Sequence, residues 1–314
     1  MMKTIVKRPI LCQTCKMYVL MTNDEFETLG CPHCDMGLVT SISSSSDLEP
    51  DGWDNSKDAT VWSHADRECG LKHVYASGSV EDDVLYPAIT DGAVRFACIS
   101  DTHCLHRDVN VPQCDYLIHS GDITNYGEPD VMNDFMDWLR GLKATGTVRK
   151  ECIVIPGNHD VTLYPEFLDS HSWRYFWDVE TVDKIDAKDV IILRDRGVEL
   201  DGIRIYGSPW VRPICQWAYC SANLKDKFDR IPANTDLLIT HSPAFSKGDN
   251  STFGSHELFD RVQLLKPLVH VVGHVHFGYG IIKEDTTYIN AALANSSSTK
   301  IVNRPIVFDM SINK

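Results

Sequence analysis

Polar side chains able to bind a metal follow several short apolar runs in this chain of 314 residues. One such run, Cys152 to Ile155, ends in Pro156-Gly157 and is followed by an amide, an imidazole and a carboxylate. The candidate ligands are Asp101, His103, Asp122, Asn158, His241, His274 and His276. Imidazole, carboxylate and amide oxygen together suit Mn, Fe, Zn or Mg, whereas soft metals prefer thiolates. These residues therefore predict a divalent metal centre.

Two pairs of these candidates are separated by a single residue: Asp101 with His103, and His274 with His276. An extended segment points residues i and i+2 to the same side. Two ions about 3.5 to 4 Å apart polarise a phosphoryl oxygen and lower the pKa of a bridging water, which becomes hydroxide near neutral pH. The spacing therefore favours phosphoryl transfer at two metal ions, and we expect Mn to be the preferred metal.

The apolar runs that precede the candidate ligands have the length and composition of buried strands. Each run is rich in Val, Ile or Leu and is bounded by Gly, Pro, Asp or Asn. The predicted strands are 94–100, 116–119, 152–155, 237–240 and 269–272. Because open α/β sheets bind ligands beyond the carboxyl ends of their strands, we expect the candidate ligands to meet at one edge.

Between and after these runs the sequence predicts a helix and further strands. Glu128-Pro129-Asp130 opens the helix, because Pro is favoured in a first turn and apolar residues then recur with helical spacing from Met132 to Leu142. Asp201-Gly202 predicts a tight turn between strands 198–200 and 203–206. Further strands are predicted at 190–193, 286–290 and 306–309. This order predicts the α/β class, with two facing sheets and helices outside, a four-layer α/β/β/α sandwich.

Four cysteines near the N-terminus have the spacing of a zinc site. Cys12 and Cys15 form one C-x2-C pair, Cys31 and Cys34 form another, and 15 residues separate the pairs. Two such turns each offer two thiolates to a tetrahedral zinc. We therefore expect one structural zinc in a ribbon over residues 1–40, whose folding depends on the metal.

The rest of the chain divides by composition. A Ser-rich stretch after residue 41 is typical of a linker, so we expect a linker and irregular lead-in over 41–90. A second domain over 91–314 contains all the candidate ligands. Residues 59–90 show no clear periodicity, and Cys69 and His73 would suit a metal only if they lay on a helix.

Charge and hydropathy oppose several function classes. The formal net charge is −14 and the pI is near 5.3, which disfavours attraction to nucleic acid and to anionic membranes. A small phosphate ester is a better partner, because bound divalent metals offset the charge locally. The N-terminus lacks a secretory signal and no apolar run approaches the length of a membrane span, so we expect a cytoplasmic protein without membrane contact.

The candidate ligands lie within motifs that together resemble the full motif set of the calcineurin-like metallophosphoesterases. The motifs are Asp101-x-His103, Gly121-Asp122, Gly157-Asn158-His159-Asp160, His241 and Gly273-His274-x-His276. The similarity covers about Val94 to Met310. Stretches 202–210 and 273–280 resemble the metallophosphoesterase-domain-containing branch of the family, which includes cyclic-nucleotide phosphodiesterases. The predicted zinc ribbon is not part of the family pattern.

The resemblance implies two ligand sets and one shared carboxylate. The first metal would be held by Asp101, His103 and His276. The second metal would be held by Asn158, His241 and His274. Asp122 would bridge the two ions.

The resemblance also implies an acid beside the metals. His159 would contact the phosphate and protonate the leaving oxygen, a step that a positioned acid accelerates about 100-fold to 10,000-fold, and Asp160 would orient it. Protein-phosphatase-like members have an arginine just before the Gly-Asn-His element, suited to a phosphomonoester dianion, where this chain has Pro156. A diester has one negative charge and has less need of such a clamp, so Pro156 favours a phosphodiesterase. The resemblance implies a nucleotide-type diester as the substrate, with a cyclic nucleotide favoured. It also implies metal-bridged hydroxide as the attacking group.

Several residues near the motifs are candidates for substrate contact, because aromatic and polar side chains line such pockets. They are His106, Trp210, Arg212, Phe245, Phe277 and Tyr279. For each of them, packing in the core or exposure in a loop is an equal alternative. His119 and His270 lie within strand runs and are predicted to be core histidines.

Other functions remain open from the sequence. The chain is a nuclease if the zinc ribbon grips nucleic acid, although Lys16 is the only Lys or Arg between Cys12 and Cys34. A phosphomonoesterase is the other enzymatic alternative. It is a non-enzymatic scaffold if the metal site is structural or regulatory, which the intact ligand set disfavours.

Overall fold

The structure is a computed structural model that describes residues 8–11, 18–21, 68–75, 86–89, 91–170, 182, 185–214, 217–244 and 254–313. The four cysteines of the predicted zinc ribbon lie outside the described residues, as does Phe245. Near the N-terminus, β1 (Arg8–Leu11) and β2 (Tyr18–Met21) pair antiparallel. Within the described residues, no helix has the length and apolar character of a membrane span.

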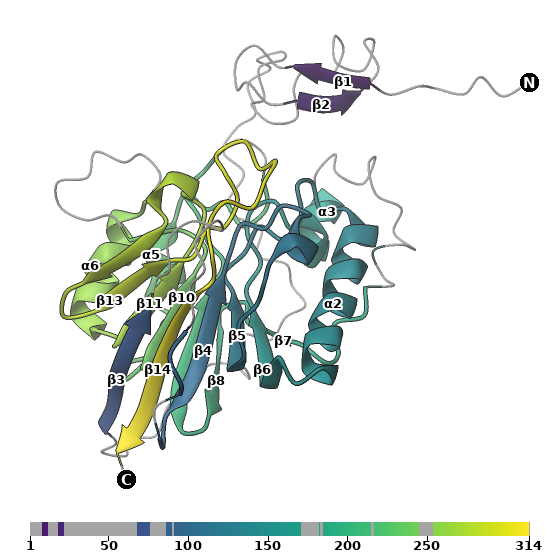
Figure 1. Cartoon of the computed structure of the whole chain (residues 1–314). Helices are drawn as coiled ribbons and strands as arrows, with labels where there is room; N and C mark the ends of the chain where they lie inside the picture. The colour runs from purple at the N-terminus through teal and green to yellow at the C-terminus, as the bar shows by residue number, and fades with distance from the viewer. Residues whose placement is uncertain are drawn as a thin grey trace, which may run out of the picture.

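Two sheets form the centre of the fold (Figure 1), and each of them has six strands. The first sheet has the order β3 (Glu68–Tyr75), β14 (Ile306–Asn313), β4 (Val94–Ile99), β5 (Cys114–His119), β6 (Val148–Val154) and β7 (Ile191–Ile192). The second sheet has the order β12 (Gly280–Lys283), β13 (Thr287–Asn290), β11 (Val269–Val272), β10 (Leu237–Thr240), β9 (Ile203–Ser208) and β8 (Arg196–Leu200). Each strand predicted from the sequence corresponds to one of these strands, with small differences in its bounds.

Both sheets contain a block of parallel strands, with antiparallel strands at the β3 edge of the first sheet and at both edges of the second. Strands β4, β5, β6 and β7 run parallel in the first sheet, as do β9, β10, β11 and β13 in the second. Ser100, just after β4, forms a parallel bridge with Ala292, just after β13, so the carboxyl ends of the two sheets meet. The loops that leave these ends therefore share one edge of the molecule.

The two sheets pack face to face through an apolar core. Phe96 of β4 lies at its centre, and its ring stacks on Tyr116 at 5.0 Å and on Phe308 at 4.9 Å between centroids. Ile239 and Val271 of the second sheet belong to the same buried cluster. Alternate residues of each strand enter this core, as expected for strands with two covered faces.

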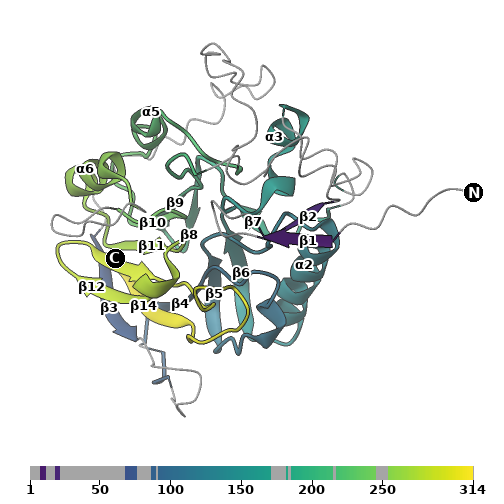
Figure 2. The same ribbon diagram turned by 90° about the horizontal axis from the view of Figure 1, so that it is seen from above.

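Helices cover the outer face of each sheet. The apolar stripe of α2 (Pro129–Ala144), which includes Met132 and Phe135, packs on the first sheet. Two short helices, α5 (Leu224–Phe228) and α6 (His256–Leu265), pack on the second. Seen from above in Figure 2, these helices lie on the opposite side of the molecule from α2. The α/β class and its helix, sheet, sheet, helix layers agree with the sequence prediction.

Local backbone preferences explain two predicted elements. Pro129 is the first residue of α2, where the helix does not need its missing N–H. Asp201 and Gly202 have φ angles of 48° and 75° in the turn between β8 and β9. Positive φ at both positions is the geometry whose twist matches an antiparallel hairpin.

Residues 68–75, within the segment that had no clear periodicity, form β3. This strand pairs antiparallel with β14, with Val307 opposite Tyr75, and extends the first sheet. Because Cys69 and His73 lie on a strand, the hypothesis that a helix brings them to a common metal is wrong.

Candidate metal centre

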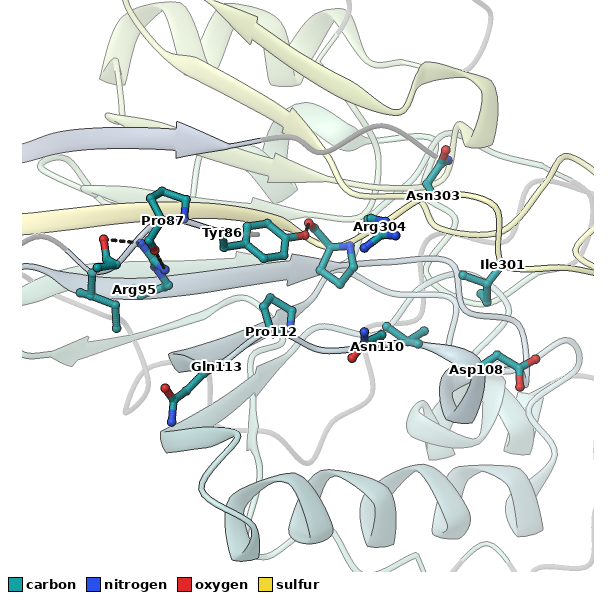
Figure 3. A pocket seen from close by; sticks show the side chains of 14 residues that line it. Tyr86, Pro87, Arg95, Asp108, Asn110, Pro112, Gln113, Ile301, Asn303 and Arg304 are labelled. Carbon is teal, nitrogen blue, oxygen red and sulfur yellow. Dashed lines mark hydrogen bonds between the residues drawn. The ribbon is translucent and has the colours of Figure 1, made fainter. Parts of the chain in front are cut away.

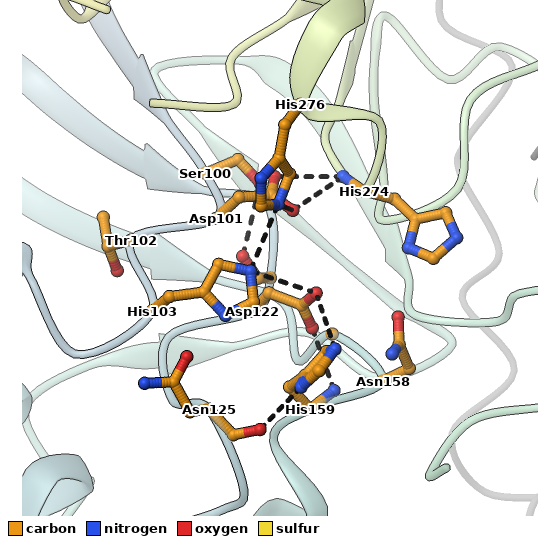
Figure 4. Close-up of polar contacts among 12 residues, drawn as sticks. Ser100, Asp101, Thr102, His103, Asp122, Asn125, Asn158, His159, His274 and His276 are labelled. Atoms are coloured by element: carbon orange, nitrogen blue, oxygen red, sulfur yellow. Dashed lines mark hydrogen bonds and ion pairs between the residues drawn. The ribbon is translucent and has the colours of Figure 1, made fainter. Parts of the chain in front are cut away.

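Loops from both sheets carry the candidate ligands to one place, as Figure 4 shows. The loops after β4, β5 and β6 contribute Asp101, His103, Asp122 and Asn158. The loops after β10 and β11 contribute His241, His274 and His276. The expected convergence at the carboxyl ends of the strands is therefore present.

The first group of ligand atoms comes from Asp101, His103 and His276, and these atoms lie within 4.8 Å of one another. His276 Nε2 lies 3.3 Å from Asp101 Oδ1 and 3.2 Å from His103 Nε2. Asp101 and His103 are buried. The group has the same members as the first ligand set that the family resemblance implied.

The second group comes from Asp122, His241 and His274, again within 4.8 Å. Asn158 joins it, because its Oδ1 lies 3.1 Å from His241 Nε2. Asp122 Oδ2 lies 3.2 Å from His241 Nε2 and 3.8 Å from His103 Nε2 of the first group. This carboxylate therefore stands between the groups, where a bridging ligand is needed.

The arrangement of lone pairs fits a cation in each group. His241 Nδ1 donates to Ser120 O and His276 Nδ1 donates to Asn295 O, both at 2.8 Å. In the neutral rings Nε2 therefore carries the lone pair and faces the carboxylate and amide oxygens. Lone pairs that face one another repel unless a cation lies between them. The sequence did not predict Ser120 and Asn295 as acceptors, because every residue has a backbone carbonyl and no sequence pattern marks the ones that accept from a ligand histidine.

The electrostatics of the site also favour positive charge. Burial alone would lower the pKa of His241 and His276, but the Asp122 and Asp101 carboxylates outweigh it and raise both to about 9. Burial would raise the pKa of Asp101, but His276 and His241 lower it to about 2. The carboxylates therefore stay ionised, and metal ions would replace the protons that balance them.

Backbone conformation is unusual at four of the ligand positions. Asp101, His103, Asp122 and His274 have φ angles of 52°, 42°, 56° and 68°. Residues other than glycine seldom adopt such angles, which cost on the order of 1–3 kcal/mol each and concentrate at functional sites. The surrounding loops therefore hold these side chains in conformations that the residues alone would not choose.

Two glycines leave the room that the ligands occupy. A Cβ on Gly157 would lie 2.2 Å from Asp122 Oδ1, and one on Gly273 would lie 2.3 Å from Asp101 Oδ2. The close approach of backbone to carboxylate explains why both motifs require glycine at these positions.

His159 lies beside the two groups and belongs to neither. Its Nδ1 donates to Asn125 O at 2.6 Å, and its Nε2 lies 4.0 Å from Asp122 Oδ2. The side chain is 16% exposed, so it is accessible from solvent. Its ring thus has one nitrogen anchored to the backbone and the other directed toward the metal side of the site.

Asp160 does not orient His159 as expected. Its carboxylate accepts hydrogen bonds from the backbone N–H groups of Gly157 at 2.8 Å and of Ile123 and Thr124 at 3.0 Å. The turn after β6 directs this side chain toward the loop after β5, while the Asn125 carbonyl holds the imidazole. Asp160 therefore ties the two loops together and acts on the site through them.

Most candidates for substrate contact have other partners. Trp210 is 8% exposed and packs edge-on against Tyr219 in the core. His106 is 1% exposed and contacts Asp134 at 2.9 Å. Tyr279 donates its hydroxyl to the carbonyl of Arg304 at 2.8 Å. Arg212 is exposed, and so is Phe277.

His119 and His270 are core histidines, as predicted. Both are fully buried. The Nε2 atom of His119 lies 2.9 Å from Thr102 Oγ1, and that of His270 lies 2.8 Å from Thr240 Oγ1. Burial lowers the pKa of each ring to about 3, so both are neutral.

Two cavities accompany the metal centre. One of about 580 Å³, shown in Figure 3, is lined by segments 86–89, 108–113 and 301–305 and by Arg95, and its lining includes none of the candidate ligands. Another, of about 240 Å³, is lined by Val275, Phe277 and Gly278 and so borders the loop that carries His276. Of the two cavities, the second has a lining residue, Val275, directly beside candidate ligands.

Residues 94–278 match the family model of calcineurin-like phosphoesterases. Together with the two facing mixed sheets and the two ligand groups, this match defines the class: the chain belongs to the calcineurin-like phosphoesterase family and is a dimetal phosphoesterase.

Among its relatives is the metallophosphoesterase domain-containing protein 1 of human and of mouse. Each is 34% identical to this chain over 258 residues, which cover 76% of this chain and 76% of the relative. A crystal structure of a dimetal phosphatase from Danio rerio shares 11% identity, with a TM-score of 0.39, and the match covers 68% of this chain and 92% of that one.

Proposed function

We propose that the protein is a phosphodiesterase that hydrolyses a nucleotide-type phosphodiester, with a cyclic nucleotide as the favoured substrate and Mn as the favoured metal. The observation that carries the proposal is Pro156, which occupies the position where protein-phosphatase-like members have an arginine clamp. Among the described residues, Asp101 and Asp122 form ion pairs only with histidines, and Pro156 is buried where a clamp would stand. A monoester dianion is best bound by a bidentate arginine, whereas a diester with a single charge does not need one.

Two divalent ions, when bound, lower the pKa of water and polarise the phosphoryl oxygen. The chain's own contribution is to hold the ions in the two ligand groups, to place the diester over them, and to supply a proton. As the bond from phosphorus to the leaving oxygen breaks, His159 donates the Nε2 proton to that oxygen. Its Nδ1–H stays on the Asn125 carbonyl, so Nε2 is the nitrogen that releases the proton.

The test compares hydrolysis of bis(p-nitrophenyl) phosphate with that of p-nitrophenyl phosphate in added Mn²⁺, followed by a panel of cyclic and linear nucleotide diesters. We expect the diester to be preferred, and we expect Asp122→Ala to abolish turnover because the carboxylate shared by both groups is lost. A preference for the monoester would contradict the diester assignment. No turnover with Mn, Fe, Zn or Mg, or full activity in Asp122→Ala, would favour the scaffold alternative.

The structural zinc of residues 1–40 also stays a proposal. It is supported by the spacing of the four cysteines Cys12, Cys15, Cys31 and Cys34. Metal analysis of the full chain and of Cys12→Ser tests it. We expect the variant to lose one zinc per chain and to keep its active-site metals; an unchanged zinc content would contradict the ribbon.

A further inference from the structure

The imidazole of His159 lies against the indole of Trp217, a residue that the proposed mechanism does not use. Their ring centroids are 4.0 Å apart and their planes are inclined by 38°. Trp217 is 4% exposed. The ring of His103 meets the same imidazole edge-on, with centroids 5.0 Å apart. The imidazole is therefore packed between rings from other loops, which limits how it can turn.

A hydrogen bond adds direction to this packing. His159 Nδ1 donates to Asn125 O at 2.6 Å. A half-turn of the imidazole would put a carbon in place of Nδ1 at that carbonyl and would move Nε2 away from the side of Asp122. The indole opposes such a turn by occupying the space that the ring would sweep.

One loop carries both the carbonyl that anchors the imidazole and the ring that backs the indole. Tyr126 follows Asn125 directly and stacks on Trp217, with centroids 6.0 Å apart and an angle of 26°. Glu128 Oε2 accepts hydrogen bonds from the backbone N–H of Asn125 at 3.1 Å and of Tyr126 at 2.8 Å. The acceptor carbonyl and the ring that backs the indole are therefore fixed relative to each other.

We propose that Trp217, backed by Tyr126, is a positioning residue that keeps His159 Nε2 directed at the leaving oxygen. The proposal rests on the proposed function, because it concerns its proton transfer. In that step the oxygen of a water molecule bonds to phosphorus and the bond to the leaving oxygen breaks. The attacking water releases a proton to the solvent, from which Nε2 is reprotonated after the reaction. The leaving oxygen keeps the electron pair and takes the Nε2 proton. Trp217 makes and breaks no bond.

Trp217 also belongs to the buried cluster on the outer side of the second sheet, so its replacement has a structural effect as well. The structural effect and the loss of positioning differ in how they depend on the leaving group. A nitrophenolate leaves as a stable anion and gains little from a proton, whereas an alkoxide depends on the acid. A positioning role therefore predicts a loss confined to substrates with an alkoxide leaving group.

The experiment compares Trp217→Leu, the conservative Trp217→Phe, and Phe228→Leu as a control. Phe228 is 1% exposed in the same cluster, and it is the last residue of α5. The substrates are 3′,5′-cyclic AMP, which releases an alkoxide, and bis(p-nitrophenyl) phosphate. For Trp217→Leu we expect a loss of about 10-fold to 100-fold in kcat on cyclic AMP and less than about threefold on the nitrophenyl ester. Trp217→Phe should keep most of the activity, and Phe228→Leu should change both substrates alike.

A second measurement does not depend on turnover. Histidine ¹H–¹³C NMR of the metal-free protein should show His159 ring signals, identified by their loss in His159→Gln, that are displaced by the ring current of Trp217. These signals should move in Trp217→Leu and stay in place in Phe228→Leu. Equal loss on both substrates, or unmoved signals, overturns the positioning role. If the wild type does not hydrolyse cyclic AMP, the favoured substrate of the proposed function fails, and the NMR comparison decides the role of Trp217.

Discussion

Replacement of Gly157 by alanine is a sharp test of the metal centre, because it adds one methyl group directly against the shared carboxylate. The new Cβ would lie 2.2 Å from Asp122 Oδ1 and 2.3 Å from Asp122 N, whereas real Cβ contacts are longer than 3.0 Å. The carboxylate must therefore move by about 1 Å to restore a van der Waals contact. Because His159 N donates to the same Oδ1 at 2.9 Å, the turn after β6 is displaced with it.

The size of the effect follows from that displacement. A misplacement of about 1 Å in a catalytic arrangement costs about 100-fold in rate, which corresponds to about 2.7 kcal/mol of transition-state stabilisation. Overpacking adds a stability loss of about 1–3 kcal/mol. We therefore expect Gly157→Ala to remain folded, to bind Mn²⁺ more weakly, and to lose about 100-fold in kcat on the diester.

Calorimetric Mn²⁺ titration, turnover of bis(p-nitrophenyl) phosphate and thermal unfolding would be measured on the same preparation. Gly141→Ala is the matched control, because Gly141 lies in α2 and a Cβ there meets nothing within 4 Å. The control should gain about 0.5–1 kcal/mol of stability and keep full activity, since alanine favours a helix. If Gly157→Ala retains both Mn²⁺ affinity and kcat within about twofold, the close contact with Asp122 does not hold the site in place.

Three further predictions concern pH, the buried ion pair and metal removal. Burial lowers the pKa of His270 to about 3 in the folded state, so protonation below pH 6.5 favours the unfolded chain and lowers the free energy of unfolding by about 1.4 kcal/mol per pH unit. In denaturant unfolding, the stability advantage of wild type over His270→Gln should therefore shrink at that rate as the pH falls below 6.5. A difference that does not change with pH would contradict this. Arg95→Leu removes the ion-pair partner of buried Asp309, 2.7 Å away, and should lower the free energy of unfolding by about 3–5 kcal/mol. The double variant Arg95→Leu/Asp309→Leu should recover part of this loss, because it leaves no buried charge unpaired. A double variant no more stable than Arg95→Leu would refute this. Removal of metal with EDTA should abolish turnover. It should also lower the free energy of unfolding by about 2.7 kcal/mol, compared with protein in Mn²⁺ at 100 times its dissociation constant. Turnover that survives dialysis against EDTA would rule out an essential metal.

The residue types and their spacing were enough to predict which candidate ligands the fold brings together. Each candidate ligand follows an apolar run whose pattern predicts a buried strand. Strand propensity and turn chemistry are local properties, so the sequence alone reveals them. The same local properties gave the helix that begins at Pro129 and the hairpin at Asp201-Gly202. They did not give β3, because a strand added beside β14 is selected by its partner and not by its own pattern.

Other features of the site were decided by tertiary structure alone. His103 and His276 are 173 residues apart in the chain and meet only because the two sheets face each other. Tertiary structure also buries Trp210, turns the Asp160 carboxylate toward the neighbouring loop, and brings Trp217 onto His159. A side chain's chemistry is set by its own residue type, so the sequence by itself determined which atoms could bind metal. The burial and the hydrogen-bond partners of a side chain depend on where the rest of the chain packs. Only the tertiary structure therefore decided which side chains are grouped, hydrogen-bonded or buried.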